Sequence, residues 1–105
     1  MNQQTNQINK MIKESVMKAD PSAQVILYGS RARGDERSDS DWDIVIIVDR
    51  DRADFSTFLA LGNPLYDLAD EQGVEINPVI YTTRQWNEAK PSLFKHNVLT
   101  EGIVL

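Results

Sequence analysis

The stretch that begins at Gly29-Ser30 combines residue types that bind phosphate groups in proteins. This pair follows the apolar residues 25–28 and opens a segment expected to form a short helical turn. Glycine lets a ligand approach the backbone closely, and free N–H groups at the start of a helical turn bind phosphate oxygens. Arg31 and Arg33 follow at once and would add charge-assisted hydrogen bonds to phosphate. The stretch therefore predicts a phosphate-binding turn.

A pair of aspartates follows at the start of the most β-branched stretch of the chain, residues 42–48. Asp41 and Asp43 are two residues apart, so in a strand their carboxylates point to the same face, while Trp42 points to the opposite one. Adjacent negative charges are unfavourable unless a cation lies between them. Mg²⁺ prefers oxygen ligands and completes its shell with water and substrate phosphates. The pair therefore predicts a magnesium clamp beside the phosphate-binding turn.

Two other sites with similar residues are excluded by the spacing. Asp39, Asp41 and Asp43 match the first ligands of a calcium-binding EF-hand loop, but that loop needs glycine next and glutamate at its twelfth position. Ile44 and Arg50 occupy those places. The glycine-containing turn is not a P-loop either, because no Gly-Lys-Ser or Gly-Lys-Thr follows it.

The elements that must hold these residues follow from the hydrophobic pattern. Apolar residues at helical spacing predict an amphipathic helix over 5–19, and a second helix is expected after Asp54, which could cap it. Pro64 lies inside that second helix and predicts a kink or two helical pieces. A short helix is expected from Thr83, with Trp86 packing inward.

Three apolar runs bounded by polar residues or glycine predict strands at 25–28, 42–48 and 74–81. Pro78 interrupts the last run, which makes it an edge strand or a bulged one. The apolar tail, 97–105, is expected to dock on the body. This order of elements predicts a single α/β (α+β) domain over 1–105, with a small mixed sheet of three or more strands flanked by helices.

Composition narrows the cellular setting. The 105 residues carry a formal net charge of −5 and no cysteine, which excludes disulfides and thiolate metal sites. No apolar run reaches membrane length and the polar start is no targeting signal, so a cytoplasmic location without membrane contact is expected. Direct nucleic-acid binding is not expected from an acidic chain. A chain this short leaves the surface that binds a large acceptor to a second molecule.

The stretch LYGSRARGDERSDSDWDIVIIV, residues 27–48, resembles the minimal nucleotidyltransferases (MNT), a branch of the polymerase-beta-like superfamily. The resemblance rests on Gly29-Ser30, on Ala32-Arg33-Gly34 and on the paired aspartates of Ser40–Asp43, in a strand–turn–strand context. It implies the nucleotidyltransferase fold, ATP or another nucleoside triphosphate as substrate, and Mg²⁺ as cofactor. The residues expected to bind the nucleotide are Gly29, Ser30, Arg31 and Arg33, with either arginine a phosphate ligand or an ordinary surface residue.

The same resemblance implies a third carboxylate on a neighbouring strand, usually the aspartate of a Val-Asp pair. Val74-Glu75 stands at that place, so the expected catalytic and metal-binding residues are Asp41, Asp43 and Glu75. Glutamate is longer by one methylene and departs from the family pattern. The third carboxylate normally completes a second metal site or activates the attacking hydroxyl, so catalytic activity depends most on this position.

Family members of this size resemble the antitoxins of HEPN/MNT toxin–antitoxin pairs. The resemblance implies transfer of AMP from ATP to a hydroxyl, typically of a tyrosine, on a HEPN toxin partner. The alternative is an antitoxin with a weak or inactive site that neutralises its toxin by binding alone, which Glu75 favours. Transfer to a small molecule, as in aminoglycoside nucleotidyltransferases, requires an added helical domain for which this chain has no room.

Overall fold

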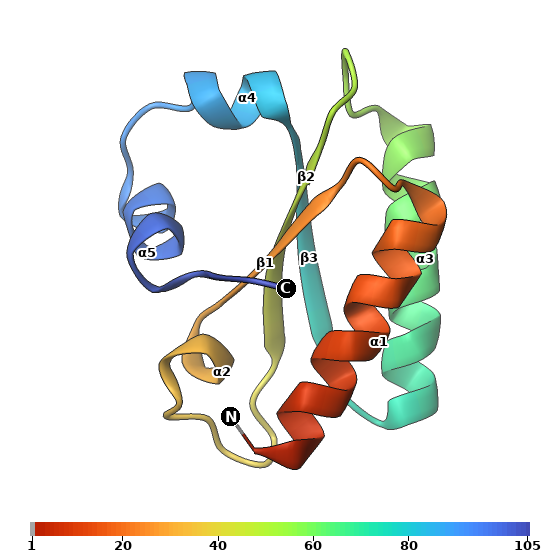
Figure 1. The fold of residues 1–105 in the computed structure, drawn as a ribbon, viewed down its shortest axis with the longest axis vertical. Helices are drawn as coiled ribbons and strands as arrows, with labels where there is room; N and C mark the ends of the chain where they lie inside the picture. The colour runs from red at the N-terminus through yellow and green to blue at the C-terminus, as the bar shows by residue number, and fades with distance from the viewer. Residues whose placement is uncertain (1) are drawn as a thin grey trace.

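A four-stranded mixed sheet lies between two helical layers in the computed structural model, which describes residues 2–105 (Figure 1). α1 and α3 cover one face of the sheet, and α4 and α5 lie on the other. The helices and strands follow in the order α1 (Gln3–Ala19), β1 (Gln24–Tyr28), α2 (Ser30–Arg33), β2 (Trp42–Val48), α3 (Phe55–Gln72), β3 (Ile76–Thr82), α4 (Thr83–Glu88), α5 (Leu93–Glu101) and β4 (Ile103–Val104). The predicted fold class is confirmed.

The strands are arranged in the order β3-β2-β1-β4. β1 is antiparallel to both β2 and β4, whereas β2 and β3 are parallel and are joined through α3. β3 therefore forms an edge of the sheet, as Pro78 predicted, because proline has no N–H to donate to a neighbouring strand. The strand begins at Ile76 rather than at residue 74, which leaves Glu75 just outside it.

β2 divides its side chains between two cores because successive residues point to opposite faces. Ile44 and Ile46 point to the core under α1 and α3, and Val45 and Ile47 point to the core under α4 and α5. The first core contains Ile8, Ile12, Val16, Val25, Leu27, Trp42, Ile44, Ile46, Val48, Leu61, Leu65 and Ile76, and the second contains Ile26, Val45, Ile47, Trp86 and Val98. A strand buried on both faces explains the unbroken apolar run seen in the sequence.

α3 runs as one helix through Pro64, so of the two predicted alternatives the two helical pieces are wrong, and the kink stays a prediction. Pro64 itself is exposed, while Leu61 and Leu65 on either side of it are buried against the sheet. Burial of that face offsets the hydrogen bond that proline cannot donate. The predicted cap is confirmed, because the side chain of Asp54 accepts a hydrogen bond from the Thr57 N–H (3.1 Å).

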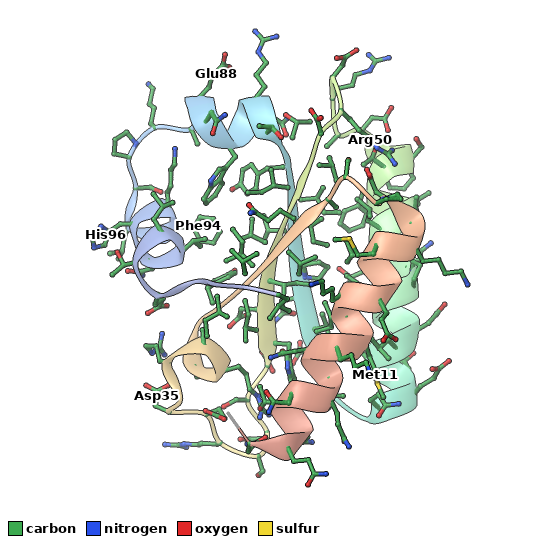
Figure 2. All side chains as sticks on the ribbon, viewed as in Figure 1. Met11, Asp35, Arg50, Glu88, Phe94 and His96 are labelled. Atoms are coloured by element: carbon green, nitrogen blue, oxygen red, sulfur yellow. The ribbon has the colours of Figure 1, made fainter. Side chains whose placement is uncertain are left out.

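The C-terminal segment docks on the sheet, as predicted. β4 pairs with β1, and α4 buries Trp86. α5 was not predicted as a helix, since its apolar residues show little helical periodicity. Figure 2 shows Phe94 on the side of α5 that faces the sheet and His96 on its outer side. Among residues 2–105 no helix has the length and apolar character that crossing a bilayer requires.

Candidate functional site

Asp41 directly precedes β2 and Asp43 is its second residue, on the face that continues as Val45 and Ile47. Both aspartates are half-buried, at the end of the sheet that α2 borders. Trp42 between them points to the opposite face and is fully buried in the first core, which confirms its expected direction. Alternation along one strand thus presents two carboxylates on one face and anchors them with the indole on the other.

Gly29 brings the predicted phosphate-binding turn against this pair. β1 and β2 are in register so that Tyr28 pairs with Asp43, and the chain turns into α2 at the next residue. Gly29 has φ 78° and ψ −158°, a backbone conformation that is essentially restricted to glycine. A Cβ at this position would lie 2.7 Å from Oδ2 of Asp43. The glycine is therefore required both by its backbone angles and by the closeness of the carboxylate.

The residue that faces Asp43 from the neighbouring strand is Asn77, not Glu75. β2 and β3 pair with Asp43 opposite Asn77. Nδ2 of Asn77 donates hydrogen bonds to Oδ2 of Asp41 (3.2 Å) and to Oδ1 of Asp43 (3.4 Å). Nothing in the sequence marks Asn77 as a site residue, because the register between the two strands cannot be read from it.

Glu75 is exposed just before β3 and lies next to Asp41. The pKa of Glu75 is raised, first by a side-chain hydrogen bond with Asp41, then by the charge of Asp41, by burial and by the charge of Asp43. Within residues 2–105 no group of three or more acidic, histidine or cysteine side chains has the arrangement of a metal site. The predicted three-carboxylate metal site, with Glu75 as third ligand, is thus not formed in this structure.

The paired aspartates themselves fit a divalent cation. Their carboxylates supply hard oxygen donors on one face, and a neutral amide is the group that lies between them. Within residues 2–105 no cationic side chain forms an ion pair with Asp41 or Asp43, so a bound cation would relieve the repulsion between the two carboxylates. Such an ion would be held by these two residues, with substrate phosphates and water completing its shell.

Arg31 does not reach toward the site, which corrects its predicted role in nucleotide binding. Its side chain is buried, with 1% exposure, and its guanidinium lies 3.8 Å from the centre of the Trp42 ring. It donates hydrogen bonds to the carbonyl oxygen of Ser40 from Nε (3.3 Å) and Nη2 (3.0 Å), and from Nη1 to Oγ1 of Thr5 (3.0 Å). These contacts hold the loop that leads into Asp41.

We expect Arg31→Met to lower the free energy of unfolding by about 2–4 kcal/mol, since it leaves the Ser40 carbonyl and the Thr5 hydroxyl without their donor. Urea denaturation followed by circular dichroism measures this change. Arg37→Met, an exposed residue in the same loop, is the matched control and should stay close to the wild type. Equal stability of the Arg31 and Arg37 variants would contradict the role assigned to the buried guanidinium.

Arg33 lies at the surface of α2, where two carboxylates bind it. Its side chain is exposed and binds two carboxylates, Asp35 through Nε (3.2 Å) and Glu101 through Nη1 (3.1 Å). The same oxygen of Glu101 also accepts the Gly29 N–H (3.3 Å). A carboxylate oxygen thus already occupies the place where the turn and Arg33 would meet a phosphate oxygen. Glu101 was missed in the sequence because α5 was not predicted.

Tyr28 is a further residue beside Asp43 that the sequence did not mark. Its ring packs against Phe94 of α5 at a centroid distance of 5.5 Å. The pKa of Tyr28 is raised by burial first, and then by the charges of Asp43 and Tyr81. The phenol therefore stays neutral over the physiological range and borders the acidic pair as a hydrogen-bonding group.

Two hollows differ in their relation to this site. One of about 290 Å³ lies beside Asp41 and is also lined by Gln4, Ser40 and Glu75. A larger one of about 570 Å³ lies between α1 and α3 and is lined by apolar and charged residues of both helices. The larger hollow is on the other side of the sheet from the aspartates, so volume does not decide which one is functional.

The family model described as "Polymerase beta, Nucleotidyltransferase" matches residues 9–105. A relative from Methanocaldococcus jannaschii, MJ0604, which is named a candidate protein adenylyltransferase, is 38% identical over 82 residues. That alignment covers 78% of this chain and 76% of the relative.

Solved structures share the fold at lower identity. A toxin–antitoxin complex with AMP-PNP matches with a TM-score of 0.59 and 22% identity, over 95% of this chain and 70% of the other. A complex of tri-AMPylated Shewanella oneidensis HEPN toxin with MNT antitoxin matches with a TM-score of 0.62 and 18% identity, again over 95% and 70%. At these identities the likeness establishes the arrangement of the elements.

Proposed function

Because this chain belongs to the polymerase beta nucleotidyltransferase family, we propose that it transfers AMP from ATP to a hydroxyl of a HEPN toxin in a Mg²⁺-dependent reaction and thereby acts as an antitoxin. The family establishes the nucleotidyltransferase class. ATP as the nucleotide, Mg²⁺ as the metal, a HEPN hydroxyl as the acceptor and the cytoplasm as the location are proposals.

The main support for this function is that the aspartate pair lies close to the Gly29-Ser30 turn. Asp43, on the same face of β2 as Asp41, lies so near the backbone of Gly29 that a Cβ there would be 2.7 Å from Oδ2. A triphosphate bound at the Gly29-Ser30 turn would therefore lie beside both carboxylates. A magnesium–nucleotide complex presents this combination of phosphate oxygens and a divalent cation.

The reaction is an in-line displacement at the α-phosphorus. The acceptor oxygen forms a bond to phosphorus, the bond between phosphorus and the pyrophosphate oxygen breaks, and pyrophosphate leaves with that electron pair. Mg²⁺ held by Asp41 and Asp43 would stabilise the charge that develops on these oxygens. Gly29, Ser30 and Arg33 would orient the phosphates.

The acceptor proton needs a base, and we assign this role to Glu75. It is exposed beside Asp41, so a hydroxyl brought by a partner protein can approach it. A carboxylate within hydrogen-bonding reach of the attacking hydroxyl is a common general base. We thus propose Glu75 as the general base and not as a metal ligand.

The partner is inferred from the relatives. The M. jannaschii relative is named for transfer to protein, and the Shewanella oneidensis complex contains an AMPylated HEPN toxin with its MNT antitoxin. An acceptor supplied by a second protein also suits the present structure, in which the acidic pair lies at one end of the sheet.

The test uses the purified chain, a HEPN protein encoded by a neighbouring gene, Mg²⁺ and ATP labelled at either the α- or the γ-phosphate. We expect label on the HEPN protein from α-labelled ATP only, and none when EDTA is present. Label from the γ-phosphate would mean phosphoryl transfer and would refute nucleotidyl transfer. No label in either case, with a stable complex, would support a protein that neutralises its toxin by binding alone.

That second function has one structural feature in its favour. Asn77, which faces Asp43, cannot ionise and so contributes no third negative charge to the site. A site with two carboxylates binds a cation less strongly than one with three. The labelling experiment decides between the two functions because a binding protein needs no nucleotide.

We expect Glu101→Gln to bind Mg-ATP about 3- to 10-fold more tightly than the wild type, because a neutral amide competes less with phosphate for the Gly29 N–H and Arg33. Isothermal titration calorimetry measures the dissociation constant. Glu88→Gln, which removes a surface ion pair with Arg84 at the far end of the molecule, is the control and should have no effect. Weaker binding by Glu101→Gln would show instead that this carboxylate holds the turn in shape.

A further inference from the structure

Asn77 occupies the central position among the acidic side chains of the site. Residues two apart in an extended chain share a face, so Asp41, directly before β2, and Asp43 of β2 lie beside Asn77 of β3, which pairs directly with Asp43. Nδ2 of Asn77 is 3.2 Å from Oδ2 of Asp41 and 3.4 Å from Oδ1 of Asp43. One side chain thus links both carboxylates.

The chemistry of the carboxamide suits this place. Its nitrogen carries two hydrogens, so it can donate one to each carboxylate. Both neighbouring oxygens are acceptors, which assigns the nitrogen rather than the oxygen of the amide to the side facing them. The partial positive charge of the N–H groups reduces the repulsion between Asp41 and Asp43 when no cation is bound.

The same carboxamide limits the negative charge of the site. An aspartate at residue 77 would add a third charge within reach of both carboxylates, whereas asparagine adds none. Glu75 hydrogen-bonds Asp41 from a position just before β3, whereas the place opposite Asp43 is held by Asn77. Divalent cations bind more tightly as the number of charged oxygen ligands rises.

We propose that Asn77 is the positioning residue of the acidic pair: it holds Asp41 and Asp43 on one face in the absence of metal and restricts the site to one divalent cation. The role of Asn77 in holding the two aspartates does not depend on the proposed function. Its role in limiting the number of cations rests on that function.

The first experiment tests the hydrogen bonds without any ligand. Thermal unfolding in EDTA compares the wild type with Asn77→Ala and Asn77→Asp. We expect Asn77→Asp to lower the melting temperature by about 4–8 °C, because it adds a third adjacent negative charge, and Asn77→Ala by about half as much. Asn87→Asp, an exposed residue of α4, is the matched control for added charge. Unchanged melting temperatures for both Asn77 variants would overturn the positioning role.

The second experiment counts cations by electron paramagnetic resonance during titration with MnCl₂ in the presence of AMP-PNP. We expect one bound Mn²⁺ per chain for the wild type and for Glu75→Gln, and at least about tenfold tighter Mn²⁺ binding by Asn77→Asp. Mn²⁺ should also restore the melting temperature of Asn77→Asp and leave that of Asn87→Asp unchanged.

Two bound Mn²⁺ ions in the wild type, with one lost in Glu75→Gln, would overturn the single-cation assignment and make Glu75 the third ligand. No Mn²⁺ binding by any variant would overturn that assignment together with the proposed function. The positioning role of Asn77 would then be decided by the EDTA experiment, which depends on neither metal nor nucleotide.

Discussion

Asp43→Asn and Asp41→Asn are each expected to reduce label transfer from ATP to the HEPN partner by about 10²–10⁴-fold, because each removes one of the two charged oxygen ligands of Mg²⁺. The fold should survive, since an amide has nearly the volume of a carboxylate and the change relieves like-charge repulsion between neighbours. The kcat/KM of transfer measures the loss, and circular dichroism checks the fold.

A second readout separates metal binding from chemistry. Mg-ATP should raise the melting temperature of the wild type but not of either aspartate variant, because a ligand stabilises only the protein that binds it. Asp49→Asn is the matched control, since Asp49 is an exposed aspartate that follows the other end of β2. Transfer that persists in both Asp41→Asn and Asp43→Asn would refute the metal-binding role of the pair.

Gly29→Ala is expected to damage stability and activity together. The backbone angles of Gly29, φ 78° and ψ −158°, are strained for any other residue, which costs about 1–3 kcal/mol in the free energy of unfolding. The new Cβ would lie 2.7 Å from Oδ2 of Asp43, so the carboxylate must move. We therefore expect loss of transfer of about 10²-fold or more, because small displacements of a catalytic group have effects of this size.

Gly34→Ala separates the effect of backbone strain from the effect of the contact with Asp43. Gly34 also has a positive φ, 82°, but nothing lies within 4 Å of the place where its Cβ would be. It should lose about 1–2 kcal/mol of stability through backbone strain and keep most of its transfer activity. Urea denaturation and the labelling assay measure both quantities. If both alanine variants transfer equally well, the contact between Gly29 and Asp43 has no catalytic importance.

Much of the fold was readable from local pattern. The β-branched residues of 42–48 predicted a strand, which β2 confirms. The two-residue spacing of Asp41 and Asp43 placed both carboxylates on one face, whichever strands paired with it. Pro78 indicated an edge strand because proline lacks an N–H, and β3 lies at the edge. Such features depend on residues next to one another in the chain.

The surroundings of the acidic pair depend instead on contacts between distant segments. Asn77, rather than Glu75, faces Asp43 because of the register in which β2 pairs with β3, and a slip of one residue would exchange the two faces. Glu101 reaches the Gly29 N–H only because α5 folds back onto the sheet.

Arg31 and Arg33 show the same division. Both are arginines beside the turn, and their chemical type predicts phosphate binding equally well for each. Arg31 is buried over the Trp42 ring, whereas Arg33 is exposed beside Glu101. Residue type and spacing thus establish which groups can bind metal and phosphate. Which of them are free to do so depends on burial and strand register, and these arise from packing between segments far apart in the chain.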